Sequence, residues 1–285
     1  MKVLNTVIEL QNQIRNMQSD SVGFVPTMGA LHNGHISLVE NALAQCQVVV
    51  VSIYVNPTQF NDKNDLKNYP RTLENDLELL EAVLRENDIV FTPDNKEIYP
   101  VEDNREFHFG NLDNVMEARL RPGHFNGVAQ VVSRLFEIVK PDIAIFGLKD
   151  FQQLAVIKAL VSQTGNKVRI IGHPIIREDD GLAMSSRNRL LEPEIRKNAS
   201  IIYKTISAAS AMISDSDIPQ IKSFVKNSIG KINQFEVEYF DIVDDTELIP
   251  VNKRSEMVIG KRYFGCIAVR AGKIRLIDNI EIGLV

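Results

Sequence analysis

This sequence of 285 residues has few cysteines and no excess of positive charge. Its two cysteines, Cys46 and Cys266, stand far apart, in or beside apolar runs. They exclude a disulfide framework and are typical of core residues in a reducing compartment. Basic residues number 32 and acidic residues 37, which gives a net charge of −5. A general attraction to nucleic acid or to an anionic membrane is therefore not expected.

Long hydrophobic runs are also lacking. Glu9, Arg15 and Asp20 interrupt the N-terminal segment, so it has no apolar region of the signal-peptide kind. No apolar run approaches the roughly 20 residues that a membrane-spanning helix needs. We therefore expect a soluble cytoplasmic protein that interacts with neither membrane nor nucleic acid. Its length allows one large domain or two smaller ones.

Two common nucleotide-binding motifs are missing. The sequence contains no G-x-G-x-x-G, so the dinucleotide-binding fingerprint is absent. Gly29 and Gly34 have the glycine spacing of a P-loop, but His-Ile follows Gly34 where that loop requires Lys-Ser or Lys-Thr. A phosphate site in this chain would therefore use neither of these two motifs.

What the first 180 residues do contain is an alternation of apolar runs with helical patterns. Residues 22–26, 47–55, 88–93, 142–147 and 167–176 read as strands, and the run 47–55 is apolar and β-branched enough to be buried on both faces. Helical patterns lie between them, of which 128–139 and 150–165 are the clearest. This alternation predicts an α/β fold, a Rossmann-like open parallel sheet with helices on both faces. Ligands bind such sheets beyond the carboxyl ends of the strands.

The pattern changes after Arg177. Residues 177–191 are polar and not periodic, which is typical of a hinge. Two helical segments (about 193–214 and 217–230) and three β-rich runs (235–243, 257–269 and 273–282) follow. We expect a first domain over 1–177 and a second, smaller α+β domain over 178–285. The polar segment 56–72 is long for a loop in a compact domain and is a candidate lid.

Two of the five histidines occur together, as His32-Asn33-Gly34-His35, just after the first of these strands. Their spacing is one residue short of the i, i+4 pair that shares a zinc ion on a helix, and no third ligand is near, which disfavours a metal site. A helix that begins here would attract anions through free N–H groups and its dipole. Imidazoles beside it can donate to phosphate oxygens. Two solvated turn histidines are the alternative.

Two further segments have residues suited to phosphate. Lys149 follows Gly147 at the end of another predicted strand, and Asp150 can cap the next helix or accept from a ribose hydroxyl. In the predicted hinge, Ser185, Ser186 and Arg187 suit a clamp on a polyphosphate leaving group. An ordinary glycine turn with an exposed lysine, and a serine pair that caps a helix, are the structural alternatives.

The order of these motifs resembles one family. HNGH and MSSRN resemble the paired HIGH and KMSKS-type motifs of the nucleotidylyltransferase and class I synthetase superfamily. More closely, PTMGALHNGH, VSIYVNPTQF, NYPRT, RPGHFNGV, FGLKDFQQL and DGLAMSSRN occur in the order found in the pantoate–β-alanine ligase family. The resemblance covers about residues 20–190 densely and continues more weakly to RLIDN near the C-terminus. It implies ATP-dependent condensation of pantoate with β-alanine through a pantoyl adenylate, with release of AMP and pyrophosphate.

The resemblance also implies site residues. His32, His35, Lys149 and Arg187 would be catalytic, with His35 in the position usually given a proton-donor role. Pantoate would be held by Gln59 and Gln153, with Gln59 also near β-alanine and with Asn56 and Tyr69 close by. The implied ATP-binding residues are Met28, Gly29, Ala30, Leu31, His32, Asn33, Gly34, His35, Gly147, Leu148, Lys149, Asp150, Ile176, Met184, Ser185, Ser186 and Arg187.

The resemblance further implies Mg²⁺ carried on the nucleotide phosphates and a homodimer formed through the N-terminal domain. Two positions depart from the family pattern: Leu148 stands where Glu is common, and Asn75-Asp76 replaces a pair of aspartates found in some relatives. We therefore assign no metal ligand to Asp76. Arg121 and His124 can approach the site or merely cap a loop, and they are left unassigned. A nucleotidylyltransferase and a catalytically silent adenine-nucleotide-binding module are the alternative functions; length and acidic balance disfavour a tRNA synthetase.

Overall fold

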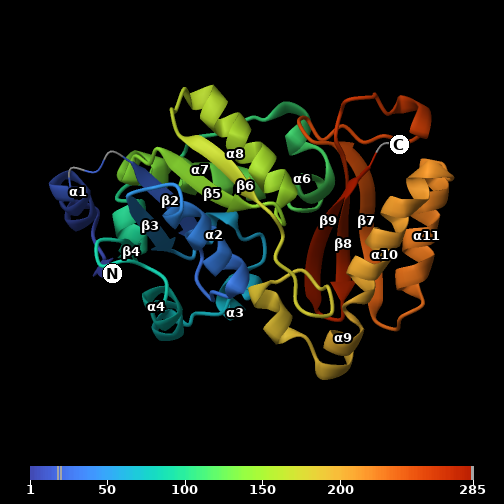
Figure 1. Ribbon diagram of the computed structural model, residues 1–285, viewed down its shortest axis with the longest axis horizontal. Helices are drawn as coiled ribbons and strands as arrows, with labels where there is room; N and C mark the ends of the chain where they lie inside the picture. The colour runs from blue at the N-terminus through green and yellow to red at the C-terminus, as the bar shows by residue number, and fades with distance from the viewer. Residues whose placement is uncertain (18, 20, 284–285) are drawn as a thin grey trace.

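The computed structural model describes residues 1–17, 19 and 21–283; Asp20 and the last two residues of the predicted second domain lie outside it. The larger of its two sheets has the strand order β1-β4-β3-β2-β5-β6, and every strand pair in it is parallel (Figure 1). The strands are β1 (Lys2–Leu4), β2 (Val22–Thr27), β3 (Val48–Ile53), β4 (Ile89–Phe91), β5 (Ile143–Gly147) and β6 (Arg169–His173).

Helices cover both faces of this sheet, as the alternation predicted. On one face α1 (Val7–Met17), α7 (His124–Val139) and α8 (Phe151–Thr164) share a core with strand residues such as Phe24. On the other, α2 (Asn33–Leu43) and α4 (Leu73–Glu81) pack against strand residues such as Val25. Because successive strand residues point to opposite faces, strands buried on both sides read as continuous apolar runs.

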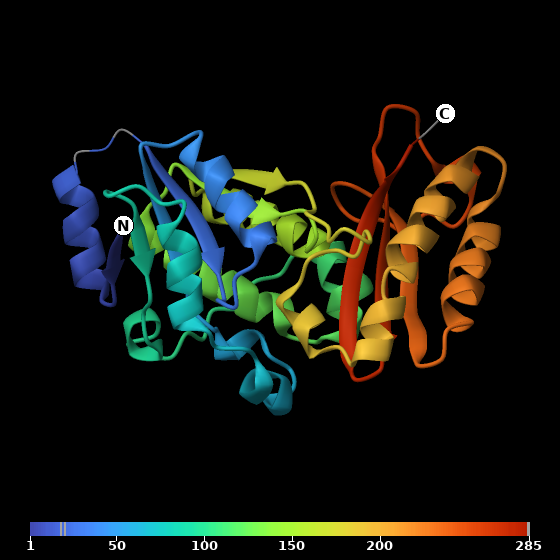
Figure 2. The same ribbon diagram turned by 60° about the horizontal axis from the view of Figure 1, so that its bottom comes forward.

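The second sheet is antiparallel, with the order β7-β8-β9. Its strands are β7 (Phe235–Asp244), β8 (Tyr263–Ala271) and β9 (Ile274–Ile282), and α10 (Ile201–Ala211) and α11 (Ile218–Gly230) cover one of its faces (Figures 1 and 2). The predicted helical segment 193–214 is divided into α9 (Pro193–Asn198), α10 and the 3-10 turn Met212–Ser214. The α/β fold with a smaller α+β part is therefore confirmed.

The other face of the small sheet packs directly on the larger body. The ring centroids of Phe264 in β8 and Phe151 in α8 lie 4.4 Å apart. Both residues belong to the apolar core that includes the larger sheet. A domain boundary between residues 177 and 178 stays a prediction, since the two sheets share part of their apolar core.

Several short elements escaped the sequence analysis because they are shorter than the window that reveals a helical period. They are α3 (Lys63–Asn68), α5 (Asn95–Ile98), α6 (Met116–Leu120) and the 3-10 turns Pro57–Gln59, Gly110–Asp113, Ser186–Leu190 and Arg254–Glu256. N-capping side chains were the available signal: Asn56, Asp62 and Asp94 each accept from a backbone N–H at the start of such an element. The segment 56–72 is thus largely structured.

The sheet order places the crevice of the fold. From β2 the chain continues to β3 and β4 on one side, and β5 and β6 lie on the other. The carboxyl ends of β2 and β5 therefore flank a topological switch point, where open α/β sheets bind ligands. The α2 N-terminus follows β2 and the α8 N-terminus follows β5. None of the described helices is long and apolar enough to cross a membrane.

Candidate active site

A cavity of about 220 Å³ lies at this switch point. It is bordered by the segments after β2, β5 and β6 and by residues 184–187. The structure brings together in its lining most of the residues that the sequence analysis singled out: Met28, His32, Gly34, His35, Asn56, Gln59, Tyr69, Gly147, Lys149, Asp150, Gln153, Ile176, Met184, Ser185, Ser186 and Arg187.

Five of the predicted ATP-binding residues do not line this cavity: Gly29, Ala30, Leu31, Asn33 and Leu148. Leu31 is fully buried in the core between the sheet and α2. Leu148 packs against the core on the other face and contacts the position of Gly172. A glutamate at position 148 would place its charge beside that apolar surface, so the leucine suits the packing of this chain. A direct contact of these five with nucleotide stays a prediction.

His32 and His35 cap helix α2 together. His32 is the N-cap residue, and its Nδ1 accepts from the backbone N–H of Gly34 at 3.1 Å. The Nδ1 of His35 accepts from the backbone N–H of His32 at 3.3 Å, which completes a capping box built from two imidazoles. A neutral imidazole that accepts at Nδ1 carries its proton at Nε2. Both rings therefore have an Nε2–H left to donate.

Burial keeps both imidazoles neutral. It lowers the pKa of His32 to about 4, with the Lys149 ammonium as the next cause. It lowers the pKa of the fully buried His35 well below its usual value, reinforced by His32 and Lys149. The two ring centroids lie 4.1 Å apart, so a charge on one ring opposes a charge on the other. At neutral pH the pair offers two neutral donors.

Much of the backbone of this turn is already hydrogen-bonded. The carboxylate of Asp76, buried in α4, accepts from the N–H groups of Ala30 and Leu31, each at 2.8 Å, and from the hydroxyl of Thr72 at 3.0 Å. Ala30 has a φ of 50°, and Gly29 has 77°, so the chain needs this support to turn sharply. The N–H of Gly34 is occupied by His32. The N–H of Gly34 is therefore not one of the free donors expected at the start of this helix, and the side chains of His32 and His35 remain as donors beside it.

Lys149 and Asp150 follow β5 at the opposite wall. The Lys149 Nζ lies 3.6 Å from a carboxylate oxygen of Asp150. Asp150 stands at the N-cap position of α8, but its side chain makes no capping hydrogen bond. Of the two roles considered for Asp150, the structure leaves its carboxylate available to a ligand.

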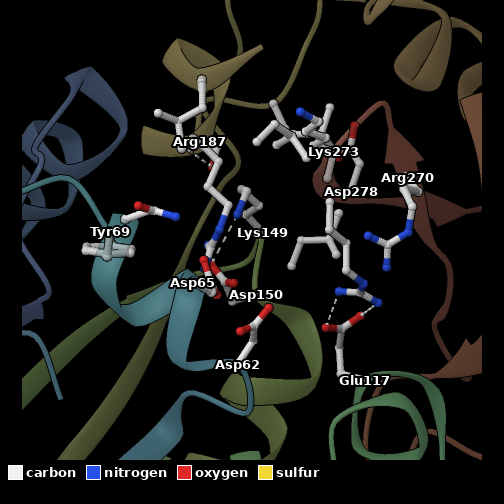
Figure 3. Close-up of a pocket in the computed structure, with 18 of the residues that line it drawn as sticks. Asp62, Asp65, Tyr69, Glu117, Lys149, Asp150, Arg187, Arg270, Lys273 and Asp278 are labelled. Carbon is white, nitrogen blue, oxygen red and sulfur yellow. Dashed lines mark hydrogen bonds and ion pairs between the residues drawn. The ribbon is translucent and has the colours of Figure 1, made fainter. Parts of the chain in front are cut away.

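Ser185 and Arg187 lie within the predicted hinge, residues 177–191. The Ser185 hydroxyl accepts from the N–H of Arg187 at 3.3 Å and so caps the 3-10 turn. The Arg187 guanidinium reaches across to Asp65 of α3 at 3.2 Å and lies near the ring of Tyr69 (Figure 3). Arg187 thus links the hinge segment to the segment 56–72.

A second, larger cavity of about 710 Å³ adjoins the first. Tyr69, Lys149, Asp150, Ser185 and Arg187 line both. The second cavity continues between α3 and α6 on one side and β9 on the other, with many charged residues around it (Figure 3). Among these, Glu117 of α6 is paired to Arg275 of β9 by two bonds of 2.6 and 2.7 Å, which ties the two parts of the chain together.

The motif RPGHFNGV, left without a role in the sequence analysis, supports the Asn56–Gln59 turn. A ring nitrogen of buried His124 lies 2.7 Å from the Gln59 carbonyl. Because a carbonyl only accepts, this Nδ1 carries a proton. The Asn56 amide donates to the carbonyl of Gly127 at 3.1 Å. A Cβ on Gly127 would stand 2.5 Å from the Thr58 carbonyl oxygen, so only glycine permits this approach.

Sequence reasoning missed the apolar wall of the smaller cavity. Val128, Val131, Val132 and Leu135 of α7 line it together with Phe146 of β5. The α7 stripe was recognised, but periodicity does not distinguish a side chain facing core from one facing a ligand. Among the described residues, no group of three or more His, Cys, Asp or Glu side chains is placed to hold a metal ion.

Comparisons with known proteins point to one family. A family model described as pantoate-beta-alanine ligase matches residues 2–281. The chain is 51% identical to the pantothenate synthetase of Azobacteroides pseudotrichonymphae over 98% of this chain and 99% of that protein. The corresponding protein of Phocaeicola vulgatus is 49% identical over 99% of both chains.

Solved structures give the same result. The pantothenate synthetase of Thermus thermophilus superposes with a TM-score of 0.90 at 39% identity, covering 100% of both chains. The pantoate-beta-alanine ligase of Francisella tularensis, solved with beta-gamma ATP and beta-alanine, has a TM-score of 0.78 at 34% identity and covers 98% of this chain and 97% of that one. The chain therefore belongs to the pantoate–β-alanine ligase family and is an enzyme of the ligase class.

Proposed function

We propose that the chain carries out the reaction of its family in the two adjoining cavities, using ATP to condense pantoate with β-alanine into pantothenate. A pantoate carboxylate oxygen attacks the α-phosphorus of ATP, and pyrophosphate leaves. The β-alanine nitrogen then attacks the carbonyl carbon of the pantoyl adenylate and loses a proton, and AMP leaves. Such phosphoryl chemistry depends on positioning and charge stabilisation more than on covalent help.

The observation that carries this proposal is the convergence of phosphate-directed donors from three segments on one cavity. His32 and His35 supply neutral N–H donors, and Lys149 and Arg187 supply cations. As pyrophosphate leaves, charge accumulates on its oxygens, and these groups stabilise it without reorganising. A neutral His35 can donate a hydrogen bond to the leaving pyrophosphate. The approach of this polyanion raises the proton affinity of the His35 imidazole.

The opposite side of the cavity suits the acid. Gln59 and Gln153 offer neutral amides to hydroxyl and carboxylate groups, with Asn56 and Tyr69 nearby. The apolar wall of α7 and β5 provides a surface for the two methyl groups of pantoate. On the family resemblance, Met28, Gly147, Asp150 and Ile176 contact adenosine, and Gln59 also approaches β-alanine.

An acyl adenylate is vulnerable to water, so the site must close over it. The 56–72 segment and the part of the chain beyond residue 177 are the moving parts that we propose. The Arg187–Asp65 ion pair, which joins them, supports this assignment. A bound triphosphate competes with Asp65 for the same guanidinium.

Three further features belong to this proposal. Mg²⁺ binds with the nucleotide, whose phosphate oxygens are the hard ligands it prefers; it neutralises phosphate charge there. The cytoplasm is the compartment that suits two buried free thiols. The active form is a homodimer through the N-terminal part, which light scattering on the purified protein tests.

The test of the function is product analysis. Protein incubated with ATP, Mg²⁺, pantoate and β-alanine should release AMP and pyrophosphate only when both the acid and the amine are present. With β-alanine omitted, ATP–pyrophosphate exchange should persist with pantoate alone. Binding of ATP without turnover would indicate a silent nucleotide-binding module, and a product that retains the nucleotide would indicate a nucleotidylyltransferase. Exchange that requires the amine would rule out the acyl-adenylate route.

A further inference from the structure

One side chain of the small sheet reaches the turn that presents Lys149. Asn279 lies in β9, an edge strand of that sheet, and is buried. Its Nδ2 donates to the carbonyls of Leu148, at 2.8 Å, and Lys149, at 3.1 Å. These two carbonyls belong to consecutive peptides between β5 and α8. A single amide therefore fixes the orientation of two adjoining peptide planes beside the lysine.

The strand that holds Asn279 is itself firmly anchored. The Asp278 carboxylate accepts from the N–H of Asn279 at 2.8 Å and pairs with Arg177 through two bonds of 2.7 and 3.0 Å. The Arg177 guanidinium also lies 3.9 Å from the ring centroid of Tyr203. Such a bidentate, stacked arginine is an ordered anchor. The amide of Asn279 thus extends from a rigid base.

Arg177 also contacts the segment that leads to Ser185 and Arg187. Arg177 donates to the carbonyl of Asn279 at 3.3 Å and to that of Gly181 at 3.1 Å. Gly181 lies in the turn that leads to Ser185 and Arg187. The Asp278–Asn279 pair therefore holds the Lys149 turn on one side and the start of the hinge segment on the other, at the edge of the larger cavity where Lys149 and Asp278 both lie (Figure 3).

We propose that Asn279 is a positioning residue for adenylation, which acts by holding Lys149 in register with the β- and γ-phosphates of ATP. This inference rests on the proposed ATP site. Two N–H groups on one nitrogen match two successive carbonyls, whereas an aspartate of the same shape sets a carboxylate oxygen against both. A displacement of a catalytic group by about 1 Å costs on the order of 10²-fold in rate. The small sheet is thus part of the phosphate site.

Asn279→Asp and its matched control, Asn111→Asp, test the proposal by ligand binding. The Asn111 amide also joins distant segments, donating to the Glu247 carbonyl at 2.8 Å, but it lines neither cavity. Asn279→Asp should weaken ATP binding at least 10-fold and AMP binding less than twofold, because only ATP has the distal phosphates. Asn111→Asp should change neither affinity. Equal weakening of ATP and AMP by Asn279→Asp would reduce Asn279 to a general structural role and overturn the proposal.

A double-variant cycle with Lys149→Ala tests whether the effect passes through the lysine. Asn279→Asp should slow pantoate-dependent ATP–pyrophosphate exchange at least 10-fold in the wild-type background and less than twofold once Lys149 is alanine. Losses that multiply independently would overturn the proposal. If Asn279→Asp does not fold, Asn279→Ala takes its place in both experiments, with circular dichroism as the check of folding.

Different results contradict the proposed function and the role of Asn279. Wild-type protein that binds no ATP contradicts the proposed function. Wild-type protein that binds ATP, alongside an Asn279 variant that binds it equally well, contradicts only the role of Asn279.

Discussion

The Nδ1 of His35 accepts the backbone N–H of His32 at 3.3 Å, so the histidine pair caps its own helix while keeping both Nε2–H groups free to donate. On the proposed function, structural and chemical roles are thereby divided between the two nitrogens of each ring. This division makes the two roles separable by substitution.

His35→Asn should separate them. Asparagine carries an oxygen near the position of Nδ1, so it can still accept from His32, but it has no donor near Nε2. We expect adenylation to fall about 10²-fold, with the free energy of unfolding within about 1 kcal/mol of the wild type. His35→Ala should lose both activity and stability. Exchange kinetics and urea unfolding measure the two quantities; near wild-type exchange by His35→Asn would remove Nε2 from the chemistry.

The buried histidines also predict an acid-sensitive fold. Burial holds the pKa of His32 and His124 at about 4 and that of His35 well below its usual value. Between pH 6.5 and about 4, the unfolded chain binds protons at these positions that the folded chain does not. The free energy of unfolding should therefore fall as the pH falls through this interval, by up to about 1.4 kcal/mol per pH unit for each histidine.

Urea unfolding of His35→Gln at pH 5 and pH 7 checks this pH dependence. One buried neutral imidazole is gone, so stability should change less between the two values than in the wild type. His108→Gln, on an exposed side chain, is the control and should leave the wild-type difference unchanged. An unchanged difference in His35→Gln would mean that His35 is not held neutral by the fold.

Asp76 is expected to support the turn before the histidines. Asp76→Ala leaves the N–H groups of Ala30 and Leu31 without their acceptor, which should cost about 2–4 kcal/mol in unfolding free energy and lower ATP affinity. The neighbouring Asn75 is exposed, so Asn75→Ala should change neither quantity. Chemical denaturation and calorimetric titration with ATP measure both. If Asp76→Ala kept wild-type stability, its two hydrogen bonds would not stabilise the turn.

The absence of a side chain at Gly127 should be needed for pantoate binding. A Cβ there would meet the Thr58 carbonyl oxygen at 2.5 Å and the Gln59 Cα at 2.9 Å. Gly127→Ala must push this turn away, and we expect the KM for pantoate to rise at least 10-fold while ATP affinity stays within twofold. Gly230, whose Cβ position is open, provides the control, since Gly230→Ala should leave both constants unchanged. Steady-state kinetics in each substrate decides; a Gly127→Ala variant with an unaltered KM for pantoate contradicts the assignment.

The architecture and the position of the candidate site could be predicted from the amino-acid sequence alone. Alternating strand and helix patterns identified the parallel sheet. A strand buried on both faces is a continuous apolar run, whereas a helix buried on one face has apolar residues at a period of about 3.6. The position of HNGH after one strand and of Lys149 after another located the crevice, because ligands bind at carboxyl ends of strands. The order of the motifs then indicated the family, which the comparisons confirm.

The contacts among these residues could be found only in the folded chain. Which imidazole nitrogen carries the proton depends on hydrogen bonds within a turn whose shape is set by Asp76, from a separate helix. The contact of Asn279 with the Lys149 turn joins segments that lie 130 residues apart in the sequence. Periodicity and motif spacing describe local geometry, whereas such contacts follow from how two sheets pack, and no local pattern in one sequence encodes that.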